Sequence, residues 1–199
     1  EMLGDSRERF SQPELSEETE VEQRRFIQKL GFRLLREVNE ATVVGATSLS
    51  STVLLAGPAN GLQLSEFAAS SRMLAEILRW RGATFTPSLE RNLGRSNFAE
   101  IIAFLQSSGL IEVQTTDTGV RLKVASGKRT ALDFYKNNSI HFFLVPALVA
   151  HATIRGVSRE DLEAEVWWWL EFFRWEFPLP EKSEVGQRIE RCLAYFSAH

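Results

Sequence analysis

The sequence has few of the residues that build covalent or metal-stabilised sites. Cys192 is the single cysteine among 199 residues, which excludes an intramolecular disulfide and a cysteine-rich zinc site and fits a reducing compartment. The histidines are His141, His151 and His199. His141 and His151 stand too far apart for the H-x-x-x-H spacing of zinc ligands on one helix face. We therefore expect no metal site, and we expect Cys192 to be a small buried hydrophobe.

Long apolar runs and an excess of positive charge are also missing. The longest mostly apolar run, residues 142–152, is shorter than the roughly 20 residues that a membrane-spanning helix needs. The first ten residues, EMLGDSRERF, are polar and charged and predict no secretory leader. The net charge of −3 argues against nucleic acid as a partner, because phosphate binding requires a positive surface. Contact with a membrane surface is compatible with these observations.

Common catalytic and nucleotide-binding motifs are absent from the sequence. There is no G-x-S-x-G nucleophile elbow, no G-x-x-x-x-G-K-[ST] phosphate loop and no G-x-G-x-x-G turn. We therefore expect this chain to bind no cofactor and to carry no catalytic residue of these classes.

Most of the sequence has the three- and four-residue apolar spacing of amphipathic helices. Residues 19–40 form the first such segment, with apolar positions at Val21, Phe26, Ile27, Leu30, Leu34, Leu35 and Val38. A short helix is predicted over 47–57, ending at Gly57-Pro58. Residues 1–18 are acidic and without periodicity, and we expect them to be a flexible lead-in. We expect residues 19–199 to form a single α-helical domain.

One region has the two-residue period of strands. LIEVQ and VRLKVA flank TTDTG, which predicts a β-hairpin. The hairpin follows a predicted helix, NFAEIIAFLQSS, closed by Gly109. The expected fold is therefore mainly α, with seven or eight helices and one hairpin. The helix and hairpin at about 96–125 resemble a winged helix.

Serine residues mark three predicted helix starts. We expect Ser65 to cap a helix that buries Phe67, Met73, Leu74, Ile77 and Leu78. Ser96 is expected to cap the helix before the hairpin, and Ser158, in a near capping box, a helix that runs on to PLP at 178–180. A further helix is expected to begin at Lys128 and to be kinked or divided at Pro146.

The winged-helix pattern raises an alternative function, binding of DNA or of a protein. Basic residues flank the pattern: Arg72, Arg79, Arg81, Arg91, Arg95, Lys123, Lys128 and Arg129. The expected recognition helix instead presents Asn97, Glu100 and Gln106, which are poorly suited to phosphates or guanine edges. A solvated helix surface explains these arginines better, so nucleic acid is not the partner we expect.

A second cluster is aromatic. It comprises Trp167, Trp168, Trp169, Phe172, Phe173, Trp175 and Phe177. Each helical residue turns the chain by about 100°, so three consecutive tryptophans cannot share one face. At least one should point away from the local core. Packing against protein is favoured over membrane contact, because several glutamates in the same segment disfavour anionic lipid.

The segment LDFYKNNSIHFFLVPALVAHA, residues 132–152, places a polar group of residues directly before the apolar run. Within it, FYKNNSIHFFLVPALVA resembles a segment of the membrane-bound bacterial and mitochondrial glycerol-3-phosphate acyltransferases. The residues that carry this resemblance are Phe134, Tyr135, Lys136, Asn137, Asn138, His141, Pro146 and Leu148. A weaker, gapped similarity covers roughly residues 30–175. The family's catalytic H-x-x-x-x-D and E-G-x-R-S motifs do not occur in this chain.

The resemblance implies a non-catalytic helical region of such an acyltransferase. Its partner would be the catalytic domain of the same polypeptide, and a membrane surface is a further candidate. The parent enzyme would use acyl-CoA or another acyl thioester as its substrate. It would be peripheral on the cytoplasmic side of the membrane.

The resemblance also singles out candidate interaction residues: Tyr135, Lys136, Asn137, Asn138 and His141. On a continuous helix Tyr135, Asn138 and His141 would share one face. We expect this polar face to form hydrogen bonds to a neighbouring domain or helix, as buried polar groups require. In the alternative, His141 and Lys136 line the path of a substrate phosphate or of coenzyme A.

Overall fold

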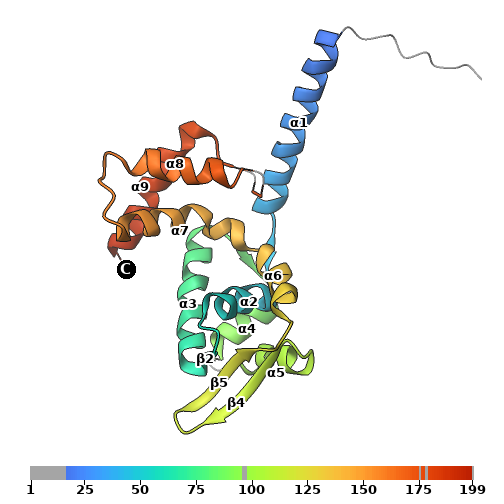
Figure 1. The fold of residues 1–199 in the computed structure, drawn as a ribbon, viewed down its shortest axis with the longest axis vertical. Helices are drawn as coiled ribbons and strands as arrows, with labels where there is room; N and C mark the ends of the chain where they lie inside the picture. Colours follow the sequence, from blue (N-terminus) through green and yellow to red (C-terminus); the bar gives the residue numbers. More distant parts are fainter. Residues whose placement is uncertain (1–16, 96–97, 175, 178, 199) are drawn as a thin grey trace, which may run out of the picture.

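A computed structural model describes residues 17–95, 98–174, 176–177 and 179–198 of the chain. The described part is mainly helical, as predicted (Figure 1). Its helices are α1 (Glu17–Glu40), α2 (Ala46–Ala56), α3 (Leu64–Trp80), α4 (Pro87–Gly94), α5 (Ala99–Ser107), α6 (Arg129–Asn137), α7 (Ile140–Ile154), α8 (Leu162–Phe172) and α9 (Lys182–Ala198). Its strands are β1 (Val43–Val44), β2 (Leu62–Gln63), β3 (Thr84–Phe85), β4 (Ile111–Thr116) and β5 (Gly119–Val124). The nine helices of the described residues compare with the seven or eight expected.

The predicted hairpin is confirmed and gains a third strand. β4 and β5 pair antiparallel from Ile111↔Val124 to Thr116↔Gly119. The short strand β2 pairs antiparallel with the other edge of β5. Gly109, with φ of +65°, adopts the left-handed conformation after α5, which glycine adopts without steric cost. The helix α5 is thus followed by the predicted hairpin within a three-stranded antiparallel sheet.

Two of the predicted helix starts are wrong. The N-cap of α3 is Gln63 instead of Ser65, because β2 ends there and Glu66 accepts a hydrogen bond from the Gln63 backbone N–H at 2.9 Å. Ser158 does accept a hydrogen bond from the Asp161 N–H, but this contact closes a turn, and α8 begins only at Leu162. The prediction for Ser96 lies outside the described residues.

Two helix interiors also differ from expectation. Met73 is exposed on α3, whereas Phe67 and Leu78 are fully buried. The helix that carries residues 132–152 is divided at Asn138–Ser139, between α6 and α7, instead of at Pro146, which lies inside α7. Asn and Ser compete with the helix by bonding to nearby backbone groups, and this accounts for the position of the break.

The helix α7 takes part in both hydrophobic cores of the molecule. The first core lies among α2, α3, α5, α6 and the sheet, and Phe142 and Phe143 contribute to it. The second core lies among α7, α8 and α9, and includes Val145, Leu148 and Val149. Figure 1 shows α7 running between the lower and the upper part of the molecule. The apolar run in the sequence is therefore explained by a helix that must be covered on both sides.

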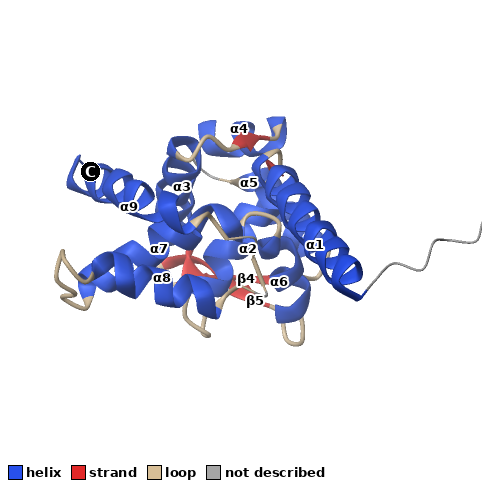
Figure 2. Ribbon diagram, turned by 90° about the horizontal axis from the view of Figure 1, so that it is seen from above, coloured by secondary structure: helices blue, strands red, loops and turns tan. Residues whose placement is uncertain are grey.

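The first helix, α1, extends away from these two cores (Figure 1). Seen from above, it lies on one side of the molecule and α8 and α9 lie on the other, with α2 between them (Figure 2). None of the helices in the described ranges is long and apolar enough to cross a membrane.

A buried hydroxyl pair fixes the break between α6 and α7 to α2. Ser139 and Ser48 are both buried, and their Oγ atoms lie 2.5 Å apart. Replacing either serine by alanine leaves the other hydroxyl buried without this partner, which typically costs about 1–3 kcal/mol.

We therefore predict that Ser48→Ala and Ser139→Ala each lower the free energy of unfolding by about 1–3 kcal/mol. The double variant should lose clearly less than the sum of the two single losses, because its second substitution removes no remaining hydrogen bond. Urea denaturation of the four proteins measures this coupling. Strictly additive losses would contradict a direct interaction between the two hydroxyls.

Candidate functional site

The structure separates the five candidate residues of the polar segment. Tyr135 is partly buried against the first core. Lys136 forms an ion pair with Asp133 at 2.8 Å. Asn137 and Asn138 are exposed at the end of α6. His141 lies on α7, beyond the break, so the shared helix face expected for Tyr135, Asn138 and His141 does not form.

His141 is the member of this group that contacts a distant segment. Its Nε2 lies 2.9 Å from the backbone carbonyl oxygen of Asn39, in the last turn of α1. A carbonyl can only accept, so Nε2 carries the proton and donates it. Burial is the main reason why the pKa of His141 is lowered. The hydrogen bond to Asn39 acts in the opposite direction, and the positive charge of Arg81 adds a smaller lowering. The side chain therefore connects α1 to α7 as a neutral imidazole near pH 7.

His141 also lines a pocket of about 470 Å³ between the two parts of the molecule. Its walls come from the end of α1, the turn after α3, the first half of α7, the segment before α9, and α9 itself. The lining residues are Asn39, Arg81, Gly82, His141, Phe142, Leu144, Val145, Phe177, Pro180, Glu184, Gln187, Arg188 and Arg191. Sequence reasoning did not assemble this site, because its members are far apart in the chain.

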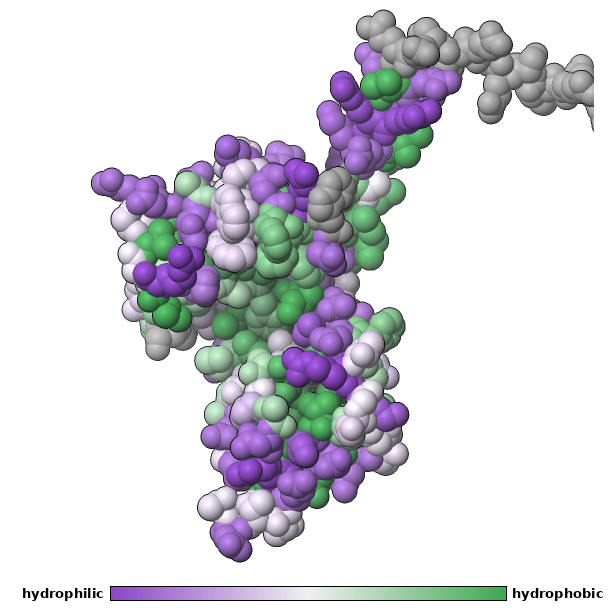
Figure 3. Space-filling view, viewed as in Figure 1, coloured by the Kyte–Doolittle hydropathy of each residue, from purple (hydrophilic) through white to green (hydrophobic). Residues whose placement is uncertain are grey.

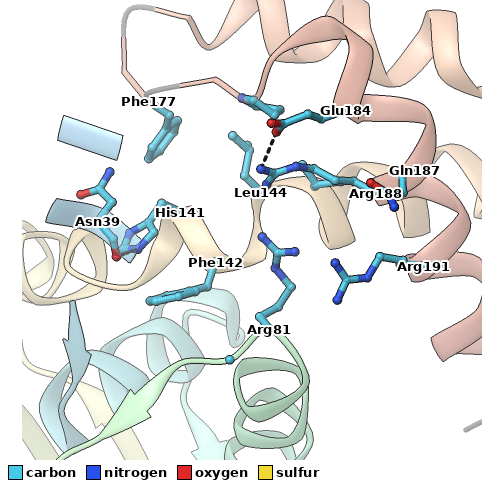
Figure 4. A pocket seen from close by; sticks show the side chains of 13 residues that line it. Asn39, Arg81, His141, Phe142, Leu144, Phe177, Glu184, Gln187, Arg188 and Arg191 are labelled. Carbon is cyan, nitrogen blue, oxygen red and sulfur yellow. Dashed lines mark hydrogen bonds and ion pairs between the residues drawn. The ribbon is translucent and has the colours of Figure 1, made fainter. Parts of the chain in front are cut away.

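Three arginines gather at this pocket. Figure 4 shows the guanidinium groups of Arg81, Arg188 and Arg191 directed toward the same space, from the turn after α3 and from α9. Arg188 is held by Glu184, one helical turn earlier, at 2.9 Å. Glu184 is the acidic residue of the lining set, so the three arginines outnumber the carboxylates there.

The three arginines also affect the pKa of the single cysteine. Cys192 is buried, as predicted, and burial raises the pKa of its thiol to about 11. Arg81, Arg191 and Arg188 all act in the opposite direction, because each positive charge favours the thiolate. All three guanidinium groups are thus close enough to act on one sulfur atom. The thiol itself stays protonated near pH 7 and has the character of a core residue.

Three of the basic residues around the hairpin are engaged in ion pairs. Arg79 pairs with Glu90, and both Arg91 and Arg95 pair with Glu100 on α5. The helix expected to read DNA therefore uses its acidic residue to neutralise two of the arginines. Nothing in this arrangement favours nucleic-acid binding.

The aromatic residues behave as the helical rotation predicts. Trp167 and Trp169 pack against the second core, whereas Trp168 is exposed on α8. Phe172 is also exposed, and its ring stacks on that of Trp168 at a centroid distance of 6.3 Å. Trp175 lies outside the described residues.

Within the described ranges, no three histidine, cysteine, aspartate or glutamate side chains converge in a way that could hold an ion.

The lowered pKa of His141 predicts a pH dependence of stability. The folded state binds this proton more weakly than the unfolded state, whose histidines titrate near 6.5. The contribution of the neutral imidazole is therefore complete above pH 6.5 and is lost as the pH falls below that value. The free energy of unfolding is measured by urea denaturation at pH 7.5 and at pH 5.5. Its decrease between these two pH values should be smaller in His141→Gln than in the unmodified chain. A slope in His141→Gln equal to that of the unmodified chain would contradict the assignment.

Comparison with known proteins places this arrangement in a family. A family model described as the glycerol-3-phosphate acyltransferase C-terminal region matches residues 1–199. A glycerol-3-phosphate acyltransferase of Shewanella amazonensis is 27% identical over 175 residues, which cover 86% of this chain and 20% of the relative. A protein of the same name from Ectopseudomonas mendocina is 26% identical over 186 residues, covering 84% of this chain and 20% of the relative.

A third relative of that name, from Shewanella pealeana, is 26% identical over 142 residues, covering 68% of this chain and 17% of the relative. This chain thus spans about a fifth of the length of the curated relatives that it matches. The matches agree with the resemblance carried by the Tyr-Lys-Asn-Asn segment. The chain belongs to the family of glycerol-3-phosphate acyltransferase C-terminal regions.

Proposed function

We propose that this chain is the non-catalytic helical region of an enzyme that transfers an acyl group from acyl-CoA, or another acyl thioester, to glycerol 3-phosphate. The family membership and the length of the relatives support this proposal. The sequence contains no H-x-x-x-x-D motif, so the chemistry belongs to another part of the polypeptide. The role of this region is then to support the catalytic domain.

The observation that carries the proposed role is the exposed apolar face of α1. Successive four-residue steps place Phe26, Leu30, Leu34 and Val38 on one face of this helix, and their exposed fractions range from 45% to 67%. Ile27 lies beside them and is 65% exposed. Figure 3 shows hydrophobic side chains on α1 where it stands clear of the rest of the molecule.

An apolar helix face of this length is stable in water only at a cost, and such faces mark protein contact surfaces. The occupant that we propose is the catalytic domain of the same polypeptide. The relatives are about five times as long as the matched segment, so a large partner is present in each of them. Docking would follow the helix-in-groove mode, with anchors at four-residue spacing.

The lipid substrate of the proposed enzyme also bears on its place in the cell. We propose that the enzyme works as a peripheral protein at the cytoplasmic surface of the membrane. The exposed indole of Trp168, stacked on Phe172, supports this, because the amphipathic rings of tryptophan favour the membrane interface. The glutamates of α8, Glu163 and Glu165 in its first turn, favour uncharged over anionic lipid.

The scaffold proposal predicts that activity requires two parts. The chain alone should not transfer radiolabelled acyl groups from acyl-CoA to glycerol 3-phosphate. It should restore transfer when mixed with the Shewanella amazonensis relative lacking its own C-terminal region. That relative's own C-terminal region is the positive control. Transfer by the chain alone would overturn the proposal. So would an inactive mixture with this chain if the relative's own C-terminal region does restore transfer.

The docking face predicts a specific loss in the same mixture. Leu30→Glu combined with Leu34→Glu should weaken binding to the catalytic part by at least about tenfold, because two charges enter an apolar contact. Gln28→Glu, which adds a charge to another face of α1, should change binding less than about twofold. Circular dichroism checks that all variants keep their helices. Equal binding by the double variant and the control would exclude α1 as the contact.

The membrane proposal is tested by flotation with phosphatidylcholine vesicles. Trp168→Ala with Phe172→Ala should reduce the floating fraction of the chain, because two exposed rings leave the interface. Phe134→Ala, which removes an exposed ring from α6, is the control and should float as the unmodified chain does. No difference between the two variants would count against an interfacial role of α8.

A further inference from the structure

The first helix, α1, has an uneven distribution of charge along its axis. Its residues 17–22, EETEVE, contain four glutamates, and Glu37 and Glu40 stand in its last turn. Residues 23–36 contain no acidic residue and five basic ones: Arg24, Arg25, Lys29, Arg33 and Arg36. The centre of α1 is therefore basic and both of its ends are acidic, within a chain whose net charge is −3.

Three of these basic residues form a row beside the apolar face of α1. Arg25, Lys29 and Arg33 follow one another at four-residue steps, so they lie on one side of the helix. All three side chains are exposed. Residues three apart are neighbours on a helix surface, so Lys29 lies next to Phe26 and Arg33 next to Leu30. The basic row therefore borders one long edge of the apolar face.

Only part of the positive charge in this row is compensated by the described residues. Arg33 pairs with Glu37 at 3.2 Å. No ion pair connects Arg25 or Lys29 to another residue that the structure describes. These two residues stand one helical turn apart, and like charges at this spacing destabilise a helix. Carboxylates of a partner, placed opposite them, would replace this repulsion by attraction.

The distribution of charge argues against two other occupants of the apolar face. Two copies of α1 that pair with their centres together bring one basic centre against the other, whether the helices run parallel or antiparallel. Like charges across a contact cost affinity. A uniformly anionic lipid surface is also a poor match, because the glutamates at both ends of α1 would lie on it together with the basic centre.

On the basis of the proposed docking of α1, we propose that the catalytic domain receives this helix in an apolar groove with carboxylates along one rim, opposite Arg25, Lys29 and Arg33. A negative patch that meets a positive one speeds association and fixes register. The charged row on one edge of the apolar face selects one orientation of α1 in the groove. The basic centre between acidic ends selects one position along the groove.

Salt separates the charged part of this contact from the apolar part. Charges at a surface are screened as sodium chloride rises from about 0.1 M to about 1 M, whereas an apolar contact has no charge to screen. Biolayer interferometry measures binding of the 199-residue chain to the Shewanella amazonensis relative lacking its own C-terminal region, and that region is the positive control. The unmodified chain should lose at least about tenfold in affinity over this range, mostly through slower association.

Arg25→Gln combined with Lys29→Gln should weaken binding about three- to tenfold at about 0.1 M sodium chloride, because two ion pairs with the rim are lost. At about 1 M the affinities of this variant and of the unmodified chain should agree within about twofold. The matched control is Arg155→Gln with Arg159→Gln, which removes the same charge from two exposed positions after α7. It should keep the affinity and the salt dependence of the unmodified chain. Circular dichroism verifies that both variants keep their helices.

The acidic rim is excluded if Arg25→Gln with Lys29→Gln binds as the unmodified chain does at both salt concentrations, or if the control loses as much affinity. Leu30→Glu with Leu34→Glu then judges the docking separately. If that variant loses binding, α1 still docks, in a groove without the acidic rim; if it binds normally, the docking and the rim fail together. A dimer of the chain in sedimentation velocity that Leu30→Glu with Leu34→Glu dissociates would assign the face to a second copy and overturn the proposal.

Discussion

The coverage of α7 on all sides is the constraint on which the rest of the structure depends. This helix is apolar around most of its circumference, so no orientation of it can leave a face in water without loss of hydrophobic stabilisation. Phe142 and Phe143 bury one side of α7 against α2, α3 and α6. Val145, Leu148 and Val149 bury the other side against α8 and α9. Two small cores are thereby held together by one shared helix.

The polar residues next to this helix have a positional role. The break at Asn138–Ser139 ends α6 before the apolar run begins, and the buried Ser139 hydroxyl is bonded to Ser48 on α2. His141, the second residue of α7, donates to the end of α1. An apolar surface gives stability but little directional information, whereas hydrogen bonds between buried groups fix position. The polar segment thus sets where α7 lies relative to α1 and α2.

Local patterns in the sequence were sufficient for the elements whose signals are local. The apolar spacing of α1, the alternation of β4 and β5 and the left-handed Gly109 each depend on neighbouring residues. Helical rotation alone required that at least one of the three tryptophans point away from the core, and the structure shows that Trp168 does so. The break after α6 also had a local signal, the consecutive Asn137, Asn138 and Ser139. We predicted the break at Pro146 instead, because proline is the stronger helix breaker in isolation.

The site depends on information that no local pattern contains. Arg81 reaches Arg188 and Arg191 only because α3 and α9 both pack against α7. The cap of α3 was misplaced for the same reason, since pairing of β2 with β5, remote in sequence, determines where that helix starts. For α1 the periodicity correctly predicts an amphipathic helix, but the surface that would cover its apolar face is not contributed by the described residues.

The end of α1 is fixed by the same polar segment. Asn39 belongs to the last turn of α1, and its carbonyl oxygen accepts a hydrogen bond from His141 on α7. The exposed apolar face of α1 therefore stands at a position relative to both hydrophobic cores that this bond helps to define. A partner docked on that face would be held, through α1, against the helix that the two cores share.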